Sequence, residues 1–248
     1  MSSISKIICS MMTETQSAIV FAATGRSVPL LVVRKAGVRR MNLRIDSAKA
    51  VVRLTLPRLA PLGPALRWVE EKRGWVETQL GRLPDASPIM PGSIIAFGDQ
   101  KLTLDWVPGH PRTPTIAGER LVVGGMPTDL PARVIRWLRK EALAKLIFET
   151  RLAAARACVT VDRVGVGDPA SRWGSCSASG AIRYSWRLIL APDFVLRATV
   201  AHEVAHRIHM DHSPKFHAKV AEIFGEDPKP ARVWLRKHAA DLHGFGRG

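Results

Sequence analysis

The sequence predicts an α+β protein with a strand-rich N-terminal region and a largely helical C-terminal region. Apolar and polar residues alternate in short runs through residues 25–127, which indicates antiparallel hairpins. Apolar positions at helical spacing dominate residues 128–248, with the composition changing near Pro127. Residues 1–24 show no clear period, and we expect them to form a loose tail. We expect the hairpin-rich region to pack on the C-terminal one.

Five segments of the N-terminal region show strand alternation: residues 41–45, 52–56, 94–97, 102–106 and 121–123. The first pair and the second pair each flank a short polar turn and predict two β-hairpins. Apolar residues at helical spacing predict a helix over residues 65–83, although Gly74 weakens it. Proline and glycine in residues 84–92 are typical of a linker.

The C-terminal region begins with a helical pattern over residues 131–157, for which Asp129 is a candidate cap. Three strand-like segments come next: residues 159–166, 172–177 and 181–190. Asp193 is a plausible N-cap for the next helix. Ser213, with proline after it, predicts another helix start, and Gly225 can end that helix.

The whole-chain composition is that of a globular protein, with 46% apolar residues in 248. The formal net charge of +16 favours acidic partners such as nucleic acid, although a solvated cationic surface explains it equally well. Three cysteines make no disulfide framework and suit a reducing compartment. No stretch approaches the roughly 20 apolar residues of a membrane span, so we expect a cytoplasmic protein.

Residues 202–206 read His-Glu-Val-Ala-His. In a helix, the two histidines of H-E-x-x-H lie one turn apart and face the same way, so one zinc ion can bind both. Glu203 between them can act as the general base toward a water molecule on the metal. Apolar residues share a different face of this helix, which would pack on the core: Leu196, Val200, Val204 and Ile208.

The third ligand must come from beyond the helix. His209 would stand about 10 Å along the axis from His202 if the helix continued, too far for Zn–N bonds of about 2.0–2.1 Å. We therefore place a turn at Met210 and Asp211, because Asp211 tolerates a left-handed conformation. His212 is then the preferred third ligand, and Glu222 on the next helix is the rival.

Three further motifs accompany this helix: W-G-S-C-S at residues 173–177, W-R-L at 186–188 and H-S-P-K-F at 212–216. Together they resemble the YgjP-like metallopeptidases, predicted metal-dependent hydrolases related to the SprT-like zincins. The resemblance covers about residues 34–243 and is strongest from 172 to 216. It implies a zincin-like catalytic domain in which His202, His206 and His212 bind Zn²⁺ and Glu203 is the catalytic acid and base.

This chain departs from the family pattern at three positions, where Ser185 and Asp211 replace asparagines and His217 replaces a tryptophan. His217 puts a titratable ring where the family has an apolar wall, which affects the pocket and its substrate preference. Tyr184, Arg172 and His217 are all candidates to stabilise an oxyanion.

The segment 172–190 could hold an extended peptide by strand addition, or form only a hairpin under the helix. We interpret Cys176, within this segment, as a small core residue rather than a ligand or nucleophile.

The predicted function is therefore a zinc-dependent metalloendopeptidase acting on protein or peptide substrates. One alternative keeps the metal chemistry but hydrolyses a non-peptide amide or ester. Another is a basic DNA-binding module with structural zinc, because two helices carry basic residues interleaved with Trp137 and Trp234. Three ligands where a structural zinc site takes four, together with Glu203, oppose that alternative.

Overall fold

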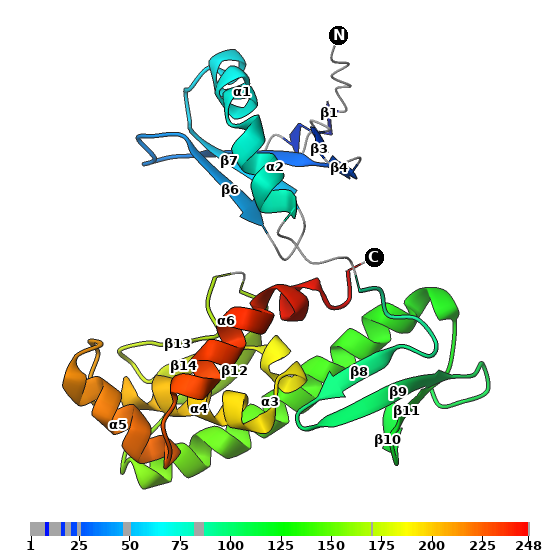
Figure 1. The fold of residues 1–248 in the computed structure, drawn as a ribbon, viewed down its shortest axis with the longest axis vertical. Helices are drawn as coiled ribbons and strands as arrows, with labels where there is room; N and C mark the ends of the chain where they lie inside the picture. The colour runs from blue at the N-terminus through cyan, green and yellow to red at the C-terminus, as the bar shows by residue number, and fades with distance from the viewer. Residues whose placement is uncertain are drawn as a thin grey trace. The chain divides into compact units, whose positions relative to one another are not determined.

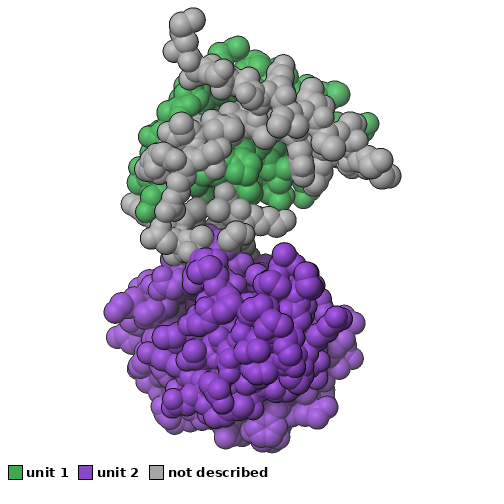
Figure 2. Space-filling model, turned by 90° about the vertical axis from the view of Figure 1, so that its right-hand side faces the viewer, with its two compact units in different colours: residues 1–85 green, residues 86–248 purple. Residues whose placement is uncertain are grey.

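The computed structural model describes residues 28–46, 51–81, 87–169 and 171–247, with the backbone of short strands at 8–9, 16–17, 21–23 and 26–27. The chain divides into two compact units, Met1–Asp85 and Ala86–Gly248 (Figure 1, Figure 2). This division lies within the predicted linker 84–92. The sequence boundary near residue 127 coincides instead with a change from strands to helices inside the second unit. In the part of the chain that the structure describes, none of the helices has the length and hydropathy of a membrane span.

Most of the predicted tail, residues 1–24, lies outside the described residues. Two short antiparallel strand pairs are described in and just after this segment. These strands are β1 (Ile8–Cys9) with β2 (Gln16–Ser17), and β3 (Phe21–Ala23) with β4 (Arg26–Val28).

The first unit contains a three-stranded sheet in which β7 (Val51–Pro57) lies between β5 (Leu30–Lys35) and β6 (Asn42–Asp46). The antiparallel pairing of β6 with β7 confirms the first predicted hairpin, whose connection, residues 47–50, lies outside the described residues. β5 pairs with β7 in parallel, which the sequence did not predict. Alternation decides which face of a strand is buried, but it does not specify the direction of its partner.

The helix predicted over residues 65–83 is two helices, α1 (Leu62–Glu71) and α2 (Arg73–Gly81). The chain leaves helical geometry at Lys72, where φ is −90° and ψ is 8°. Gly74, a poor helix former, occupies the second position of α2. Apolar residues of the strands and of both helices form the core of this unit: Val28, Leu30, Val32, Val52, Leu54, Leu56, Ala65, Val69, Val76 and Leu80.

The second unit begins with a four-stranded sheet in the order β10-β11-β9-β8. β8 (Ile94–Phe97) and β9 (Gln100–Trp106) form the second predicted hairpin, which turns through Gly98 at a φ of 59°. β11 (Arg120–Val123) pairs in parallel with β9 and antiparallel with β10 (Thr115–Ala117). Both predicted hairpins are antiparallel, but β9 with β11 and β5 with β7 pair in parallel, so the strand-rich region is not antiparallel throughout as the sequence predicted.

The short 3-10 helix η1 (Pro127–Asp129) leads into the long helix α3 (Leu130–Arg156), which begins one residue before the predicted segment. Asp129 occupies the N-cap position, but its carboxylate accepts a hydrogen bond from the Arg133 guanidinium at 3.3 Å and caps no backbone N–H. Figure 1 shows α3 running through this unit, with the β8–β11 sheet towards one end and α5 (Pro214–Phe224) at the other. The Arg156 side chain donates to the Ile223 carbonyl at this second end.

A second sheet of this unit has the order β12-β14-β13, with β12 (Arg163–Gly167), β13 (Gly174–Cys176) and β14 (Ala181–Ser185). The strand predicted to reach residue 190 ends at Ser185. There the serine hydroxyl accepts a hydrogen bond from the Arg187 N–H, and the 3-10 helix η2 (Trp186–Leu190) begins. Local capping by a short polar side chain thus competes successfully with strand continuation.

Arg187 of η2 forms hydrogen bonds with the C-terminal end of α6 (Lys229–Gly244). Its buried guanidinium donates to both carboxylate oxygens of Asp168, at 2.7 and 3.1 Å, and to the carbonyls of Leu242 and Phe245, at 2.7 and 3.0 Å. It also lies over the Trp186 ring, 4.7 Å from the centroid. These bonds satisfy an otherwise costly buried charge and give the W-R-L motif a structural role.

Candidate metal centre

Helix α4 (Asp193–Ala205) carries the first part of the site on a well-buried framework. Leu196, Val200 and Val204 are buried as predicted, whereas Ile208 lies beyond the helix and is 39% exposed. The helix therefore presents one face to the core and leaves its two histidines on another.

The start of α4 is capped by a residue from a distant hairpin. Asp193 is the first helical residue and caps no N–H itself, so its predicted role as N-cap was wrong. The carboxylate of Asp99, in the β8–β9 turn, accepts from the Asp193 N–H at 3.0 Å. Asp193 instead forms an ion pair with Lys145 of α3. These contacts connect α4 to the first sheet of this unit and to α3.

The chain turns directly after α4. The N–H groups of Ile208 and His209 both donate to the Ala205 carbonyl at 3.0 Å, which ends the helical bonding. The chain then bends at Met210 and Asp211, where we expected the turn, but neither residue has a positive φ. The predicted left-handed conformation of Asp211 was therefore wrong.

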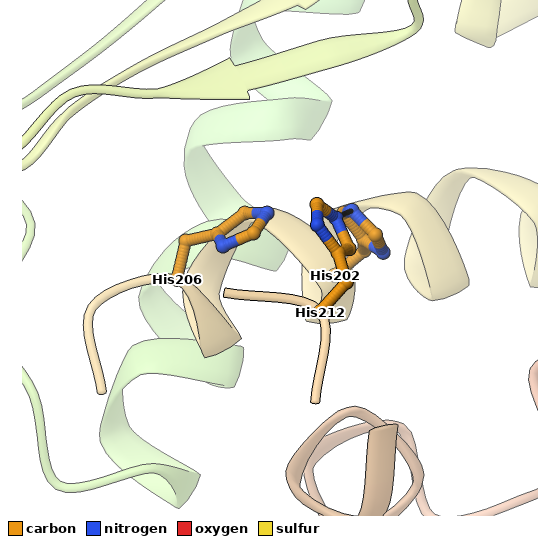
Figure 3. Close-up of side chains that lie close together, drawn as sticks. All are labelled: His202, His206 and His212. Atoms are coloured by element: carbon orange, nitrogen blue, oxygen red, sulfur yellow. Dashed lines mark hydrogen bonds between the residues drawn. The ribbon is translucent and has the colours of Figure 1, made fainter. Parts of the chain in front are cut away.

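This turn brings His212 back to the two histidines at the end of α4 (Figure 3). His202, His206 and His212 each offer a ring nitrogen, and these atoms lie within 4.8 Å of one another. Among the described residues, they form the one group of three or more potential metal ligands. Glu222 lies outside the group and pairs with Lys219 at 2.6 Å.

The geometry of the three rings fits a metal ion. The Nε2 atoms of His202 and His212 are 3.3 Å apart, which is about the separation of two tetrahedral ligands with metal–nitrogen bonds of about 2.0–2.1 Å. Nδ1 of His206 lies 3.1 Å from the His209 carbonyl, and since a carbonyl can only accept, Nδ1 must donate. That tautomer leaves Nε2 of His206 with a free lone pair.

The surroundings of His202 and His206 lower the pKa of both rings and so favour the neutral imidazole, which is the form that binds a metal. Burial, followed by the charges of His206 and His212, lowers the pKa of His202 to about 4. Burial also lowers the pKa of His206, although its hydrogen bond to the His209 carbonyl opposes this.

Phe216 supports all three rings from the first turn of α5. It is fully buried, stacks on His206 with centroids 4.5 Å apart, and meets the rings of His202 and His212 at 4.9 and 4.8 Å. Ser213 fixes the start of α5 as predicted by accepting from the Phe216 N–H, and Gly225 ends it in a left-handed conformation. In the sequence, Phe216 stands out only as part of a motif, and its contact with the three rings was not predicted.

Glu203 lies beside the histidines but is almost completely buried, with 5% of its surface exposed. Burial raises the pKa of Glu203 to about 7, against the opposing charge of Arg172. Its side chain lies against the backbone of Gly174 in β13. A Cβ atom at that glycine would stand only 2.6 Å from Cγ and 2.7 Å from Cδ of Glu203. The glycine of the W-G-S-C-S motif therefore makes room for this carboxylate.

Glu203 and His202 line a cavity of about 250 Å³, together with residues of the β13 segment, α5 and α6. Arg172 and His217, two of the three candidate oxyanion stabilisers, are among these lining residues. Tyr184, the third, is fully buried, and its hydroxyl shares a hydrogen bond with Thr150 at 3.0 Å. Tyr184 is therefore a core residue rather than a candidate for contacting substrate.

β13 forms one edge of its sheet beside this cavity. The Ser185 N–H donates to the Trp173 carbonyl, and the Ser177 N–H donates to the Ala181 carbonyl. With the β13–β14 register, these bonds direct the backbone groups of Gly174 and Cys176 away from β14, towards the free edge. The Cys176 side chain packs against the core, and burial raises the pKa of its thiol.

The tryptophans of the two basic helices belong to the core. Trp137 is 8% exposed, and Trp234 packs against the core and stacks on His238 with centroids 4.4 Å apart. Their rings are thus engaged within the protein, which weakens the argument for base stacking by these helices.

Residues 39–238 match the YgjP-like metallopeptidase domain, which is most of the chain. Searches of curated proteins and of solved structures each gave no significant match. The matched region includes the three histidines, Glu203 and the motifs of the β13 segment.

Proposed function

The chain belongs to the YgjP-like metallopeptidase family, and from this premise we propose that it is a zinc-dependent peptidase. The observation that carries the proposal is the cluster of three imidazoles beside a buried glutamate, which lines a cavity together with one of them, His202. His202, His206 and His212 would hold the ion. When bound, a zinc ion with three protein ligands keeps an open position and acts as a Lewis acid toward water and a carbonyl oxygen.

Glu203 is the proposed general base and acid. A base works best when its pKa lies near the operating pH, and burial places that of Glu203 at about 7 before any cation is bound. A neighbouring cation lowers it from there and favours the carboxylate. The carboxylate accepts a proton from the attacking water and returns it to the leaving amine.

We further propose that the substrate is an extended peptide alongside β13. The backbone N–H and C=O groups of Gly174 and Cys176 can pair with it as an added strand. This arrangement would bring a peptide carbonyl past Glu203, with Arg172 or His217 available to stabilise the oxyanion. All of these residues lie in 128–248, the region that the sequence predicts to be catalytic.

The decisive experiment combines zinc content by elemental analysis with a casein-cleavage assay. Wild type should contain about one zinc per chain and cleave casein in a chelator-sensitive manner. Glu203→Gln should retain the zinc and lose turnover, since the glutamate is placed as a base and not as a ligand. Its matched control is Glu222→Gln, an exposed glutamate outside the site, which should retain both.

Two results would contradict the proposal. A zinc-free wild-type protein after purification in zinc-containing buffer would remove the metal chemistry. Full activity of zinc-loaded Glu203→Gln would remove the assigned base. Chelator-sensitive turnover of small amides or esters, without cleavage of any protein, would favour the alternative of a non-peptide hydrolase.

A further inference from the structure

The cavity beside Glu203 has an unusual balance of charge. Two guanidinium groups line it, Arg172 from the segment before β13 and Arg232 from α6, whereas Glu203 is the one carboxylate among its described lining residues. The two arginines are 60 positions apart in the sequence and come together only in the fold. The reacting groups therefore lie next to a site of positive charge.

Among the described residues, Arg172 acts on Glu203 through its charge, but neither arginine is held in an ion pair. Within the described residues, no side-chain hydrogen bond or ion pair engages Arg172 or Arg232. Other arginines of this unit do pair, as Arg187 does with Asp168. The acidic residues that come just before Arg232 in the sequence do not line the cavity. One of them, Asp227, accepts a hydrogen bond from the Lys229 N–H.

The remaining walls restrict what can enter. Val220 of α5 and Ala231 and Leu235 of α6 contribute apolar surface. The volume of about 250 Å³ is below the roughly 300–1,000 Å³ of sites for drug-sized ligands. A pocket of this size and lining suits one side chain or chain end with an apolar stem and a negatively charged tip.

We propose that this cavity, the anion pocket lined by Arg172 and Arg232, selects peptide substrates with a carboxylate next to the scissile bond. The inference rests on the proposed peptidase function and specifies its substrate class. A guanidinium binds a carboxylate through two charge-assisted hydrogen bonds, so each arginine can recognise it directly. The carboxylate can come from an aspartate or glutamate side chain, or from the C-terminus of a short peptide.

The test uses the zinc-loaded full chain and fluorogenic peptides that differ only at one residue, which is glutamate, glutamine or lysine. The residue is placed first at the position just before the scissile bond and then at the position just after it. Each peptide is made with a free and with an amidated C-terminus. At one position, kcat/KM for the glutamate peptide should exceed that for the glutamine peptide by about 10- to 100-fold. A preference that survives amidation identifies the side chain as the source, and one that requires the free end identifies the C-terminus.

Variants then assign the preference to the pocket. Arg232→Gln should reduce it to about 3-fold or less, and Arg232→Glu should shift it towards lysine-containing peptides. Arg236→Gln is the matched control, because Arg236 is an exposed arginine one turn along α6 that does not line the cavity. It should keep the full preference.

The two failures have different signatures. Cleavage of glutamate and glutamine peptides at equal rates, or a preference unchanged in Arg232→Gln, would overturn the anion pocket and leave the peptidase intact. Cleavage of no peptide by fully zinc-loaded protein would overturn the proposed function and the substrate claim together.

Discussion

Gly174 offers the sharpest test of the site, because replacing it with alanine adds one carbon atom directly against the proposed base. The new Cβ would lie closest to Oε1 of Glu203 and 2.6 Å from its Cγ, where ordinary contact begins near 3.4 Å, so the side chain must withdraw by about 1 Å. The φ of Gly174 is not in the left-handed region, so alanine adds a steric problem and no backbone strain.

A misplacement of about 1 Å in a catalytic group can lower the rate by about 10²-fold, which corresponds to about 2.7 kcal/mol in the activation free energy. The three atoms nearest to the added Cβ all belong to Glu203, so the clash falls first on the proposed base and zinc affinity should change little. We therefore expect Gly174→Ala to lower kcat/KM by about two orders of magnitude at full zinc occupancy.

The assay is kcat/KM on a peptide substrate, with zinc content and thermal unfolding measured on the same preparations. Gly165→Ala is the matched control, because Gly165 lies in β12 of the same sheet and a Cβ there meets no atom within 4 Å. Wild-type activity in Gly174→Ala, or a loss that simply parallels loss of zinc, would refute the assigned contact between this glycine and the base.

Three further predictions concern the ligands and the framework. His212→Ala should weaken zinc binding, measured by competition with a chelator. The loss should exceed the roughly 10–100-fold that is typical when a residue that only hydrogen-bonds a metal ligand is changed. Glu222→Ala should leave zinc binding unchanged. Asp99→Ala removes the cap of α4 and should lower the free energy of unfolding by about 1 kcal/mol, seen as a fall in Tm of about 2–4 °C with unchanged zinc content. Burial raises the pKa of Asp168, but the hydrogen bonds and charge of Arg187 outweigh this and hold that pKa below its usual value. The ionised Asp168 therefore stabilises the fold above about pH 4 and loses this effect as the pH falls through its lowered pKa. Asp168→Asn should cost about 2–3 kcal/mol at pH 7, less than the roughly 3–5 kcal/mol of a fully buried pair, and should show a shallower loss of stability below pH 4 in denaturant titrations. An unchanged acid profile would show that another carboxylate controls it.

The parts of the site that depend on local spacing were predictable from the sequence. The helical period places His202 and His206 one turn apart, and the Ser213 and Gly225 caps agree with the conformations those residues prefer. The arithmetic of helix rise also excluded His209 and required a turn before the third histidine. These conclusions need only a few consecutive residues, so no knowledge of tertiary contacts was necessary.

The predictions that were wrong concern features that depend on contacts between distant segments of the chain. The cap of α4 comes from Asp99, 94 residues before the helix, and local propensity therefore pointed to Asp193 instead. The sequence predicts that the strand ending at Ser185 continues to residue 190, because the apolar residues there are buried whether they form a strand or a 3-10 helix. Parallel pairing of β5 with β7 is likewise set by where the connecting chain runs, which alternation does not record.

The contact between Gly174 and Glu203 explains why the H-E-x-x-H pattern is insufficient to define such a site. The helix alone directs two imidazoles to a common side, but the carboxylate between them is held by the strand that packs against it. A larger residue at that point of β13 would clash first with this carboxylate, since the three atoms nearest to an added Cβ all belong to Glu203. Since β13 also directs backbone groups to its free edge, the same short strand both positions the proposed base and offers the surface along which a peptide could lie. The proposed chemistry therefore requires glycine at 174 as well as glutamate at 203, because a side chain at 174 would occupy the space that the carboxylate fills.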